Sequence, residues 1–236
     1  MAFTAEKNLG VRMNTFIPDL IIEVTGACNR ACVGCYAPNV VSNEGVTALY
    51  EKRPELFLGV VALNNALNEL ERLPSVTSIR GGEPSLHPKI GVLLMMASRH
   101  SDQVMLETHG RWLLPENVAS NKELVQAIKD SGIIVKISFD KMHGMKKDEL
   151  QKITDFLNWY EIDYRIAITE NTLADYIDTR SVCYWVDEGK IIFQQKAKTE
   201  LELVKPLIGT INVRGELRKT VTHKFIEESV LGVAFA

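Results

Sequence analysis

The stretch DLIIEVTGACNRACVGC, residues 19–35, joins a short apolar run to three closely spaced cysteines. Its first part, residues 19–26, is rich in apolar and β-branched side chains and ends in glycine, a pattern that predicts a buried β-strand. Cys28, Cys32 and Cys35 follow directly, with the spacing C-x3-C-x2-C. Three thiols so close together after a strand indicate a metal or redox site.

The composition is that of an ordinary globular chain of one domain, residues 1–236. The chain has a mass of 26.5 kDa, 46% hydrophobic and 24% charged residues, and a formal net charge of -3. This charge gives no general basic field, so a nucleic-acid partner is not expected. No apolar run is long enough for a signal peptide or a membrane span, which predicts a cytoplasmic protein with no membrane partner. Cysteines are kept reduced in the cytoplasm, which favours a metal site over disulfides.

Strand-like and helix-like patterns alternate along the rest of the chain. Further strand-like runs lie at residues 75–82, 103–110, 133–140 and 164–170, with a candidate sixth strand at residues 190–197. Helical patterns lie between the first five strands, at residues 54–73, 88–100, 116–131 and 146–160. Strands that alternate with helices at this spacing predict parallel βαβ units. From the pattern alone, these units would form either a partial barrel or an open doubly wound sheet.

Distinctive short motifs lie where the predicted strands end. GGEP, residues 81–84, follows the second strand; ETHG, residues 107–110, ends the third; and SFD, residues 138–140, ends the fourth. The carboxyl ends of parallel strands meet at one edge of a sheet, where α/β folds place their active sites. The sequence therefore predicts one site that joins these segments to the three cysteines.

Three cysteines do not complete a usual metal site, and the missing ligand separates two kinds of site. A structural zinc ion is usually bound by four Cys or His ligands. The histidines considered as the fourth ligand are His87, His100, His109 and His143, and none has zinc-finger spacing. A [4Fe–4S] cluster normally takes four cysteines, so three would leave one iron with an open position for a small molecule.

The C-x3-C-x2-C motif after the first strand, together with GGEP after the second, resembles the radical S-adenosylmethionine (SAM) enzymes. The resemblance covers about residues 19–197, and the C-terminal extension, residues 198–236, has no recognised match. It implies an α/β fold, namely a partial (β/α)6 TIM barrel of parallel strands with outer helices. It also implies one [4Fe–4S] cluster, bound by Cys28, Cys32 and Cys35, whose fourth iron binds SAM. The C-terminal extension has no cysteine-rich segment of the kind that holds auxiliary clusters, so a second cluster is not expected.

The resemblance further implies which residues contact SAM. The expected cofactor-binding residues are Tyr36, Gly81, Gly82, Glu83, Pro84, Glu107, Thr108, Ser138 and Asp140. GGEP would contact the methionine amino group, with Glu83 as an acceptor and the two glycines allowing a close backbone approach. Ser138 and Asp140 would contact the ribose. Tyr36, which follows Cys35, would lie near the adenine in place of the family's usual aromatic residue.

The reaction implied is reductive cleavage of SAM to a 5′-deoxyadenosyl radical, which abstracts a hydrogen atom from a substrate. A low-potential electron donor such as a flavodoxin or a ferredoxin would supply the electron. The first hypothesis is a small-molecule or nucleotide-derived substrate, because the chain is compact and shows no added recognition domain. The alternative is a peptide- or protein-modifying enzyme, including a glycyl-radical activase, and a non-catalytic iron–sulfur or zinc-binding protein is a different class. Cys183 is either a packing residue or a hydrogen donor, and His109 is a candidate substrate contact.

Overall fold

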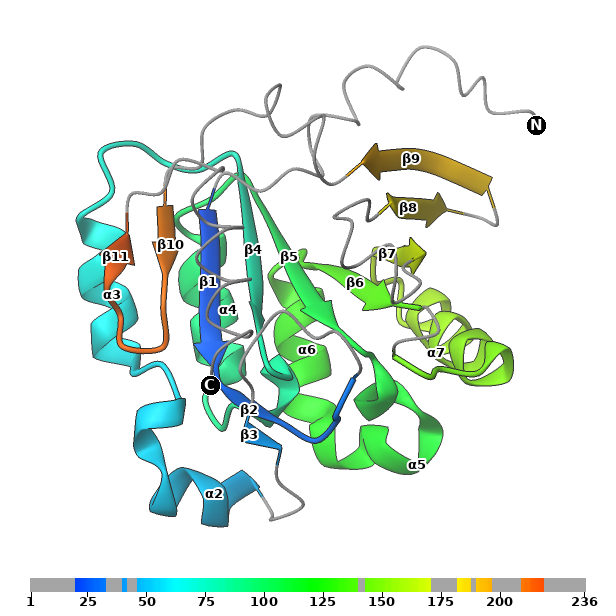
Figure 1. Cartoon of the computed structure of the whole chain (residues 1–236), viewed down its shortest axis with the longest axis horizontal. Helices are drawn as coiled ribbons and strands as arrows, with labels where there is room; N and C mark the ends of the chain where they lie inside the picture. The colour runs from blue at the N-terminus through cyan, green and yellow to red at the C-terminus, as the bar shows by residue number, and fades with distance from the viewer. Residues whose placement is uncertain are drawn as a thin grey trace.

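The computed structural model describes residues 20–32, 40–41, 46–139, 143–170, 182–187, 190–196 and 209–218. Its main feature is a nine-stranded sheet with the strand order β11-β10-β1-β4-β5-β6-β7-β8-β9 (Figure 1). The strands of this sheet are β1 (Leu20–Thr25), β4 (Val76–Gly81), β5 (Gln103–Thr108), β6 (Ile134–Ser138), β7 (Tyr164–Glu170), β8 (Val182–Asp187), β9 (Lys190–Lys196), β10 (Gly209–Ile211) and β11 (Leu217–Arg218). A second, small sheet pairs β2 (Ala27–Cys28) with β3 (Val40–Val41).

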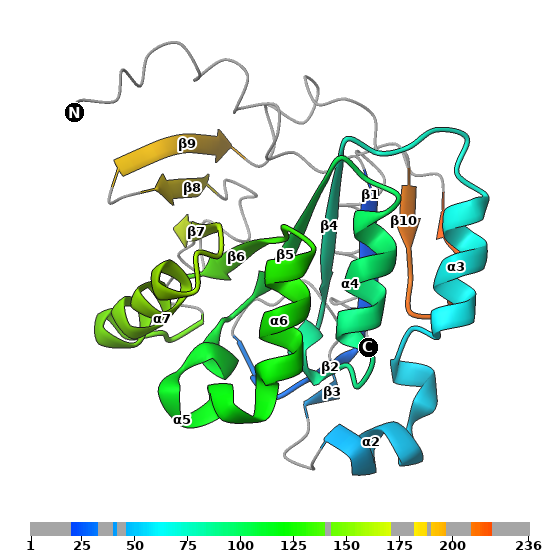
Figure 2. The ribbon, with the colours of Figure 1, turned by 180° about the vertical axis from the view of Figure 1, so that it is seen from behind.

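Five neighbouring strands, β1, β4, β5, β6 and β7, run parallel and alternate with helices along the chain. The helices between them are α2 (Val46–Lys52), α3 (Val60–Asn68), α4 (Ile90–Ser98), α5 (Pro115–Val118), α6 (Lys122–Asp130) and α7 (Lys147–Trp159). Seen from behind, α4 and α6 lie against one face of the sheet (Figure 2). The expected α/β partial barrel, with parallel strands and outer helices, is therefore confirmed.

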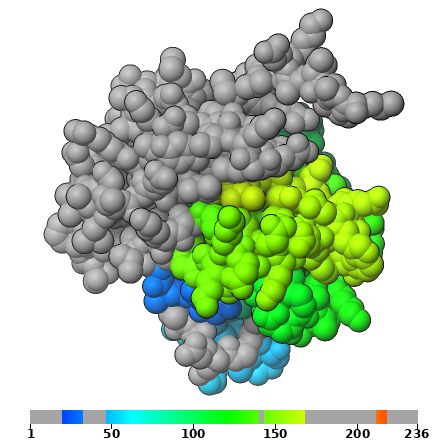
Figure 3. Space-filling view, turned by 90° about the vertical axis from the view of Figure 1, so that its right-hand side faces the viewer, coloured from blue at the N-terminus to red at the C-terminus, as the bar shows by residue number. Residues whose placement is uncertain are grey.

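The main core lies between the sheet and the outer helices. Leu20 and Ile22 of β1 are fully buried there with Leu63 of α3, Leu93 of α4 and Ile128 of α6. Burying each such side chain contributes about 1.5–3 kcal/mol. Successive residues of a strand point to opposite faces, and a smaller apolar cluster forms separately from the main core. This cluster consists of Val76, Met105, Ile134 and Ala167. From the α7 side, the green and yellow-green residues form one continuous surface (Figure 3).

The sixth predicted strand is present, but it does not extend the parallel part of the sheet. β9 pairs antiparallel with β8, and β8 pairs antiparallel with β7. Residues 188–189 alone connect β8 to β9, whereas a parallel crossover needs about a dozen residues or more. In place of the expected six βα units, the described sheet has five neighbouring parallel strands with helices between them, followed by the antiparallel strands β8 and β9.

The helix predicted at residues 54–73 is interrupted. A 3-10 turn, η1 (Pro54–Leu56), precedes α3, and the chain between them is extended. The backbone N–H of Leu58 donates to the carbonyl of Val24 in β1, with an N–O distance of 2.9 Å. Pairing with the end of β1 therefore overrides the helical spacing of the apolar residues. The helical run at residues 116–131 likewise consists of separate pieces, namely α5, η4 (Ala119–Asn121) and α6.

The described part of the C-terminal extension, residues 209–218, adds a hairpin beside β1. β10 pairs parallel with β1, and β11 pairs antiparallel with β10. Ile211 of β10 is fully buried in the main core. The turn of the hairpin packs closely on α3, since a Cβ on Gly215 would lie 2.5 Å from the Cβ of Ala62. These residues therefore belong to the folded core.

Candidate active site

Backbone hydrogen bonds at the ends of β1 and β4 bring the cysteine motif against GGEP. The N–H of Gly82 donates to the carbonyl of Thr25 (2.7 Å), and the N–H of Glu83 donates to the carbonyl of Ala27 (2.9 Å). Ala27 directly precedes Cys28, the first cysteine of the motif. Two motifs that are more than fifty positions apart are therefore adjacent at the carboxyl end of the sheet.

Gly81 lies where β1 and β4 approach too closely for a side chain. The register of the two strands shifts between Glu23 and Thr25, and Thr25 lies opposite Gly81. A Cβ on Gly81 would lie 2.3 Å from the carbonyl oxygen and 2.9 Å from the nitrogen of Thr25. The close backbone approach at this glycine is thus one between two strands.

The segment of the cysteine motif, residues 28–35, is called the cysteine loop, and it provides thiols beside GGEP. Cys28 is buried, with 6% of its surface exposed, and Cys32 is partly buried. Cys35, Tyr36 and Asp140 lie outside the described residues. Within the described ranges, no three His, Cys, Asp or Glu side chains gather into a metal site. Thiolates are the usual ligands of iron–sulfur clusters, so the chemistry of this loop fits a cluster.

Two of the histidines considered as a fourth zinc ligand have both ring nitrogens in hydrogen bonds. For His87, Nδ1 accepts from the N–H of Lys89 (3.0 Å), and Nε2 lies 2.9 Å from the carbonyl oxygen of Leu58. A backbone N–H can only donate, so Nδ1 carries no proton and Nε2 donates. Burial of His87, which is 2% exposed, lowers its pKa to about 4 even though its backbone hydrogen bonds raise it. His87 is therefore a neutral structural histidine, and His109 is engaged in a similar way.

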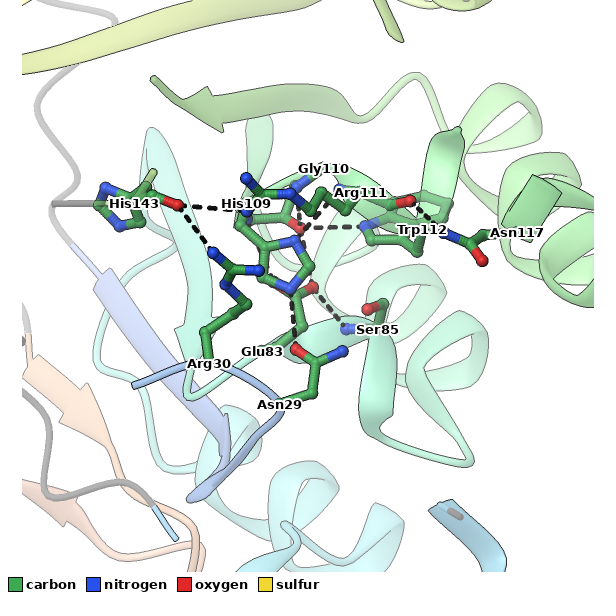
Figure 4. A network of polar contacts seen from close by, with 11 residues as sticks. Asn29, Arg30, Glu83, Ser85, His109, Gly110, Arg111, Trp112, Asn117 and His143 are labelled. Atoms are coloured by element: carbon green, nitrogen blue, oxygen red, sulfur yellow. Dashed lines mark hydrogen bonds and ion pairs between the residues drawn. The ribbon is translucent and has the colours of Figure 1, made fainter. Parts of the chain in front are cut away.

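Glu83 connects GGEP to the end of β5. Its carboxylate is 1% exposed, and Oε1 accepts from the N–H of Ser85 (3.1 Å) and the hydroxyl of Thr108 (2.8 Å). Oε2 accepts from the backbone N–H of His109 (3.1 Å) and lies 3.3 Å from Nε2 of the same residue (Figure 4). A carboxylate has about four acceptor positions. The acceptor positions of Glu83 therefore face protein donors, and its expected contact with SAM stays a prediction.

The imidazole of His109 joins the end of β5 to the cysteine loop. Nδ1 accepts from the backbone N–H of Arg111 (3.1 Å), so Nε2 carries the proton and donates to Oδ1 of Asn29 (3.0 Å) (Figure 4). Burial lowers the pKa of His109, which is 7% exposed. The charges of Arg111 and Arg30 lower this pKa further, against the opposite effect of Glu83. The ring is therefore neutral, and both of its nitrogens are engaged within the protein.

Two arginines connect the cysteine loop and β5 to the segment before α7. Nη2 of Arg30 donates to the carbonyl of His143 (3.3 Å), and Nη1 of Arg111 donates to the same oxygen (3.2 Å) (Figure 4). Arg111 also donates to the carbonyl of Gly144 (2.7 Å) and forms an ion pair with Glu149 of α7 (3.1 Å). The segments that follow β1, β5 and β6 thus share one polar network.

Charged side chains cross four neighbouring strands near the site. Nη2 of Arg80 lies 3.7 Å from Oε1 of Glu23, its partner in the β1–β4 register. Nζ of Lys136 lies 2.8 Å from Oε1 of Glu107, its partner in the β5–β6 register, and Ser78 donates to the same oxygen (2.6 Å). Burial alone would raise the pKa of Glu107, but Lys136, Arg80 and the hydrogen bond from Ser78 lower it to about 2. Glu107 is therefore ionised, and this part of the sheet is strongly polar.

The other residues expected in the site lie at the ends of β5 and β6, in the turn after GGE, and in β8. Thr108 is buried, and its hydroxyl donates to Glu83 while accepting from Nε1 of Trp112 (2.9 Å). Pro84 is buried in the 3-10 turn η2 (Pro84–Leu86), and Ser138 is partly buried at the end of β6. Cys183 lies in β8, opposite Thr169 of β7, on the far side of β7 from β6.

Several residues of these networks were not predicted as site residues, among them Asn29, Arg30, Arg111 and Lys136. Lys136 carries a recognisable signal, because a charged residue interrupts the apolar run IIVKI of a buried strand. Asn29 and Arg30 occupy the variable positions of the cysteine motif, where only the fold shows which partners they meet.

A model of the radical SAM superfamily matches residues 22–154, more than half of the chain. The chain therefore belongs to the radical SAM superfamily of enzymes. Membership implies a [4Fe–4S] cluster and the binding of SAM.

Three solved structures of SuiB from Streptococcus suis are among those similar to this chain. The structure bound to the precursor peptide SuiA is 13% identical over 63% of this chain and 38% of SuiB, with a TM-score of 0.30. The structure bound to S-adenosylmethionine is 16% identical over 65% of this chain and 41% of SuiB, and a third SuiB structure is 13% identical over 91% and 47%, both with a TM-score of 0.32. The chain thus spans less than half the length of these SuiB chains. No curated protein matches the sequence.

No helix among the described residues is both long enough and apolar enough to cross a membrane.

Proposed function

We propose that this protein cleaves SAM reductively at a [4Fe–4S] cluster and uses the 5′-deoxyadenosyl radical to abstract hydrogen from a small-molecule or nucleotide-derived substrate. The observation that carries this proposal is the attachment of GGEP to Thr25 and Ala27, immediately before Cys28. The cluster, held by Cys28, Cys32 and Cys35, would lie beside the segment that takes the methionine part of SAM. A flavodoxin or a ferredoxin would deliver the electron.

The residues of the chain have separate tasks in this proposal. Gly81 lets the backbone of β4 come close to β1, the N–H of Gly82 donates to Thr25, and Glu83 fixes the following turn to β5. Ser138 ends β6 at the same edge of the sheet, where a ribose contact with Asp140 is expected. The remaining proposed cofactor contacts are Tyr36, Pro84, Glu107 and Thr108.

The charged pairs near the site support a polar substrate. Glu107 and Lys136 are partners on adjacent strands, and the low pKa of Glu107 keeps its carboxylate charged at neutral pH. A paired charge favours a polar ligand over an apolar one. An apolar ligand would displace water from the charged groups without replacing the hydrogen bonds that the water made. This favours a polar small molecule or a nucleotide derivative as the substrate.

Anaerobic reconstitution tests the cluster and the cleavage reaction. The wild-type chain should bind about four irons and four sulfides and should form 5′-deoxyadenosine from SAM under reducing conditions. The triple variant Cys28→Ala, Cys32→Ala, Cys35→Ala should lose both properties, whereas Cys183→Ala should keep the cluster. A triple variant that still binds a full cluster would show that the ligand assignment is wrong.

A second experiment tests the substrate class. A cell extract is divided by ultrafiltration into a small-molecule filtrate and a retained fraction of proteins and large peptides. The filtrate should increase 5′-deoxyadenosine formation by the wild-type enzyme. Stimulation by the retained fraction alone would contradict the proposed substrate class and leave the cleavage activity standing.

A further inference from the structure

Both residues that flank Cys28 are connected to Glu83. On one side, the carbonyl of Ala27 accepts from the backbone N–H of Glu83 (2.9 Å). On the other side, Oδ1 of Asn29 accepts from Nε2 of His109 (3.0 Å), whose backbone N–H donates to the Glu83 carboxylate (3.1 Å). The loop around Cys28 is therefore attached to GGEP twice, once directly and once through a histidine.

The second connection has a fixed direction. Because Nδ1 of His109 accepts from the backbone N–H of Arg111 (3.1 Å), the single ring proton is on Nε2. That proton points toward the Asn29 oxygen at 3.0 Å, with the Glu83 carboxylate oxygen at 3.3 Å. Figure 4 shows the ring close to both side chains, with a dashed line from the ring to Asn29. The ring is buried, so water does not compete strongly for its hydrogen bonds.

We propose that His109 is a positioning residue that holds the loop of Cys28 in register with GGEP through its hydrogen bond to Asn29. This rests on the proposed function, because the register matters only if the loop holds the cluster and GGEP holds SAM. His109 touches neither of them directly in this proposal. Residues that orient metal ligands in this indirect way typically change metal affinity or activity by about 10–100-fold when they are replaced.

Two substitutions separate the two hydrogen bonds of the ring. Asn in place of His109 keeps a side-chain acceptor for the N–H of Arg111, as in an Asx turn, but it is too short to reach Asn29. Gln has the length to carry an N–H to Asn29 but leaves the N–H of Arg111 without its acceptor. The positioning role therefore predicts a greater effect for His109→Asn than for His109→Gln, although both remove the imidazole.

The experiment compares reconstituted wild type with His109→Asn, His109→Gln, Asn29→Ala and the double variant His109→Asn, Asn29→Ala. Three quantities are measured: the rate at which an iron chelator removes the cluster, the Kd for SAM, and the midpoint of thermal unfolding. We expect His109→Asn and Asn29→Ala each to lose the cluster about tenfold faster. His109→Gln should stay within about threefold of wild type, and the double variant should be no worse than either single variant, because both remove the same bond.

The outcomes distinguish the two proposals. A wild-type chain that assembles no cluster and cleaves no SAM refutes the proposed function, and the positioning role with it. If the wild type assembles the cluster, the positioning role is refuted by a wild-type rate of cluster loss in His109→Asn or by effects of His109→Asn and Asn29→Ala that multiply. It is also refuted if cluster loss follows the thermal midpoint in every variant, since that result indicates a purely structural histidine.

Discussion

The protonation of His87 should make the free energy of unfolding fall steeply as the pH is lowered from neutrality. The ring is neutral in the folded chain, with its pKa lowered from 6.5 to about 4, mainly by burial. The unfolded chain takes up a proton below pH 6.5, whereas the folded chain resists it until about pH 4. The stabilisation is therefore complete above pH 6.5 and is lost as the pH falls toward 4. At about 1.4 kcal/mol for each pKa unit it amounts to about 3 kcal/mol, of which about 2 kcal/mol is lost by pH 5.

The variant His87→Gln isolates this contribution. Gln does not titrate, and its side-chain N–H can still donate to the carbonyl of Leu58. The free energy of unfolding is measured with urea at pH values from 7.5 to 5 for both proteins, prepared with the same cluster content. Wild type should lose about 2 kcal/mol more than His87→Gln over this range, because His109 and the carboxylates titrate in both. Parallel curves for the two proteins would refute the assignment of a buried, neutral His87.

Two further substitutions test the strands that carry the site, each against a control measured by urea unfolding. Gly81→Ala should destabilise the chain by about 3 kcal/mol, because its Cβ would meet the backbone of β1, whereas Gly59→Ala, whose Cβ would have its nearest neighbour at 3.8 Å, should change stability by less than about 1 kcal/mol. Lys136→Met should cost about 2 kcal/mol by removing the cation paired with the partly buried Glu107. Lys129→Met removes an exposed pair and should cost less than about 1 kcal/mol. Equal losses for a variant and its control would show that the close approach at Gly81 or the partly buried ion pair of Lys136 has been misjudged.

The parallel strands could be predicted from the sequence because each has a short apolar run, and the first four also have a glycine or a polar motif at the end. The run at residues 164–170 has the same bounds as β7, and the other four differ by at most two residues at either end. The antiparallel β8 was not predicted. Its sequence, VCYWVD, followed by two residues and the run of β9, carries the signal of a hairpin. The alternation of strands and helices earlier in the chain favoured another βα unit over this hairpin.

The helix at residues 54–73 shows why apolar spacing alone was insufficient. Leu56, Val60, Leu63, Leu67 and Leu70 fit one face of a helix. The structure keeps this periodicity for α3 alone, because Leu58 pairs with the backbone of β1. A hydrogen bond to a strand far away in the sequence leaves no trace in local periodicity. The same limit applies to the site, where Asn29 and His109 are 80 positions apart.

The polar network at the strand ends has a physical cause in the architecture. The main core fixes β1, β4, β5 and β6 against the outer helices, but the buried polar side chains at the strand ends, Glu83, Thr108 and His109, cannot be held by apolar packing alone. Hydrogen bonds hold these side chains in place. The Glu83 carboxylate accepts three of them, from Ser85, Thr108 and His109. Each of these bonds contributes about 1.5–3 kcal/mol when one partner is charged. A substitution at Glu83 therefore removes hydrogen bonds to Ser85, Thr108 and His109 together. A variant of Glu83 with weaker affinity for SAM shows the loss of a direct contact only if it retains the cluster as well as wild type does.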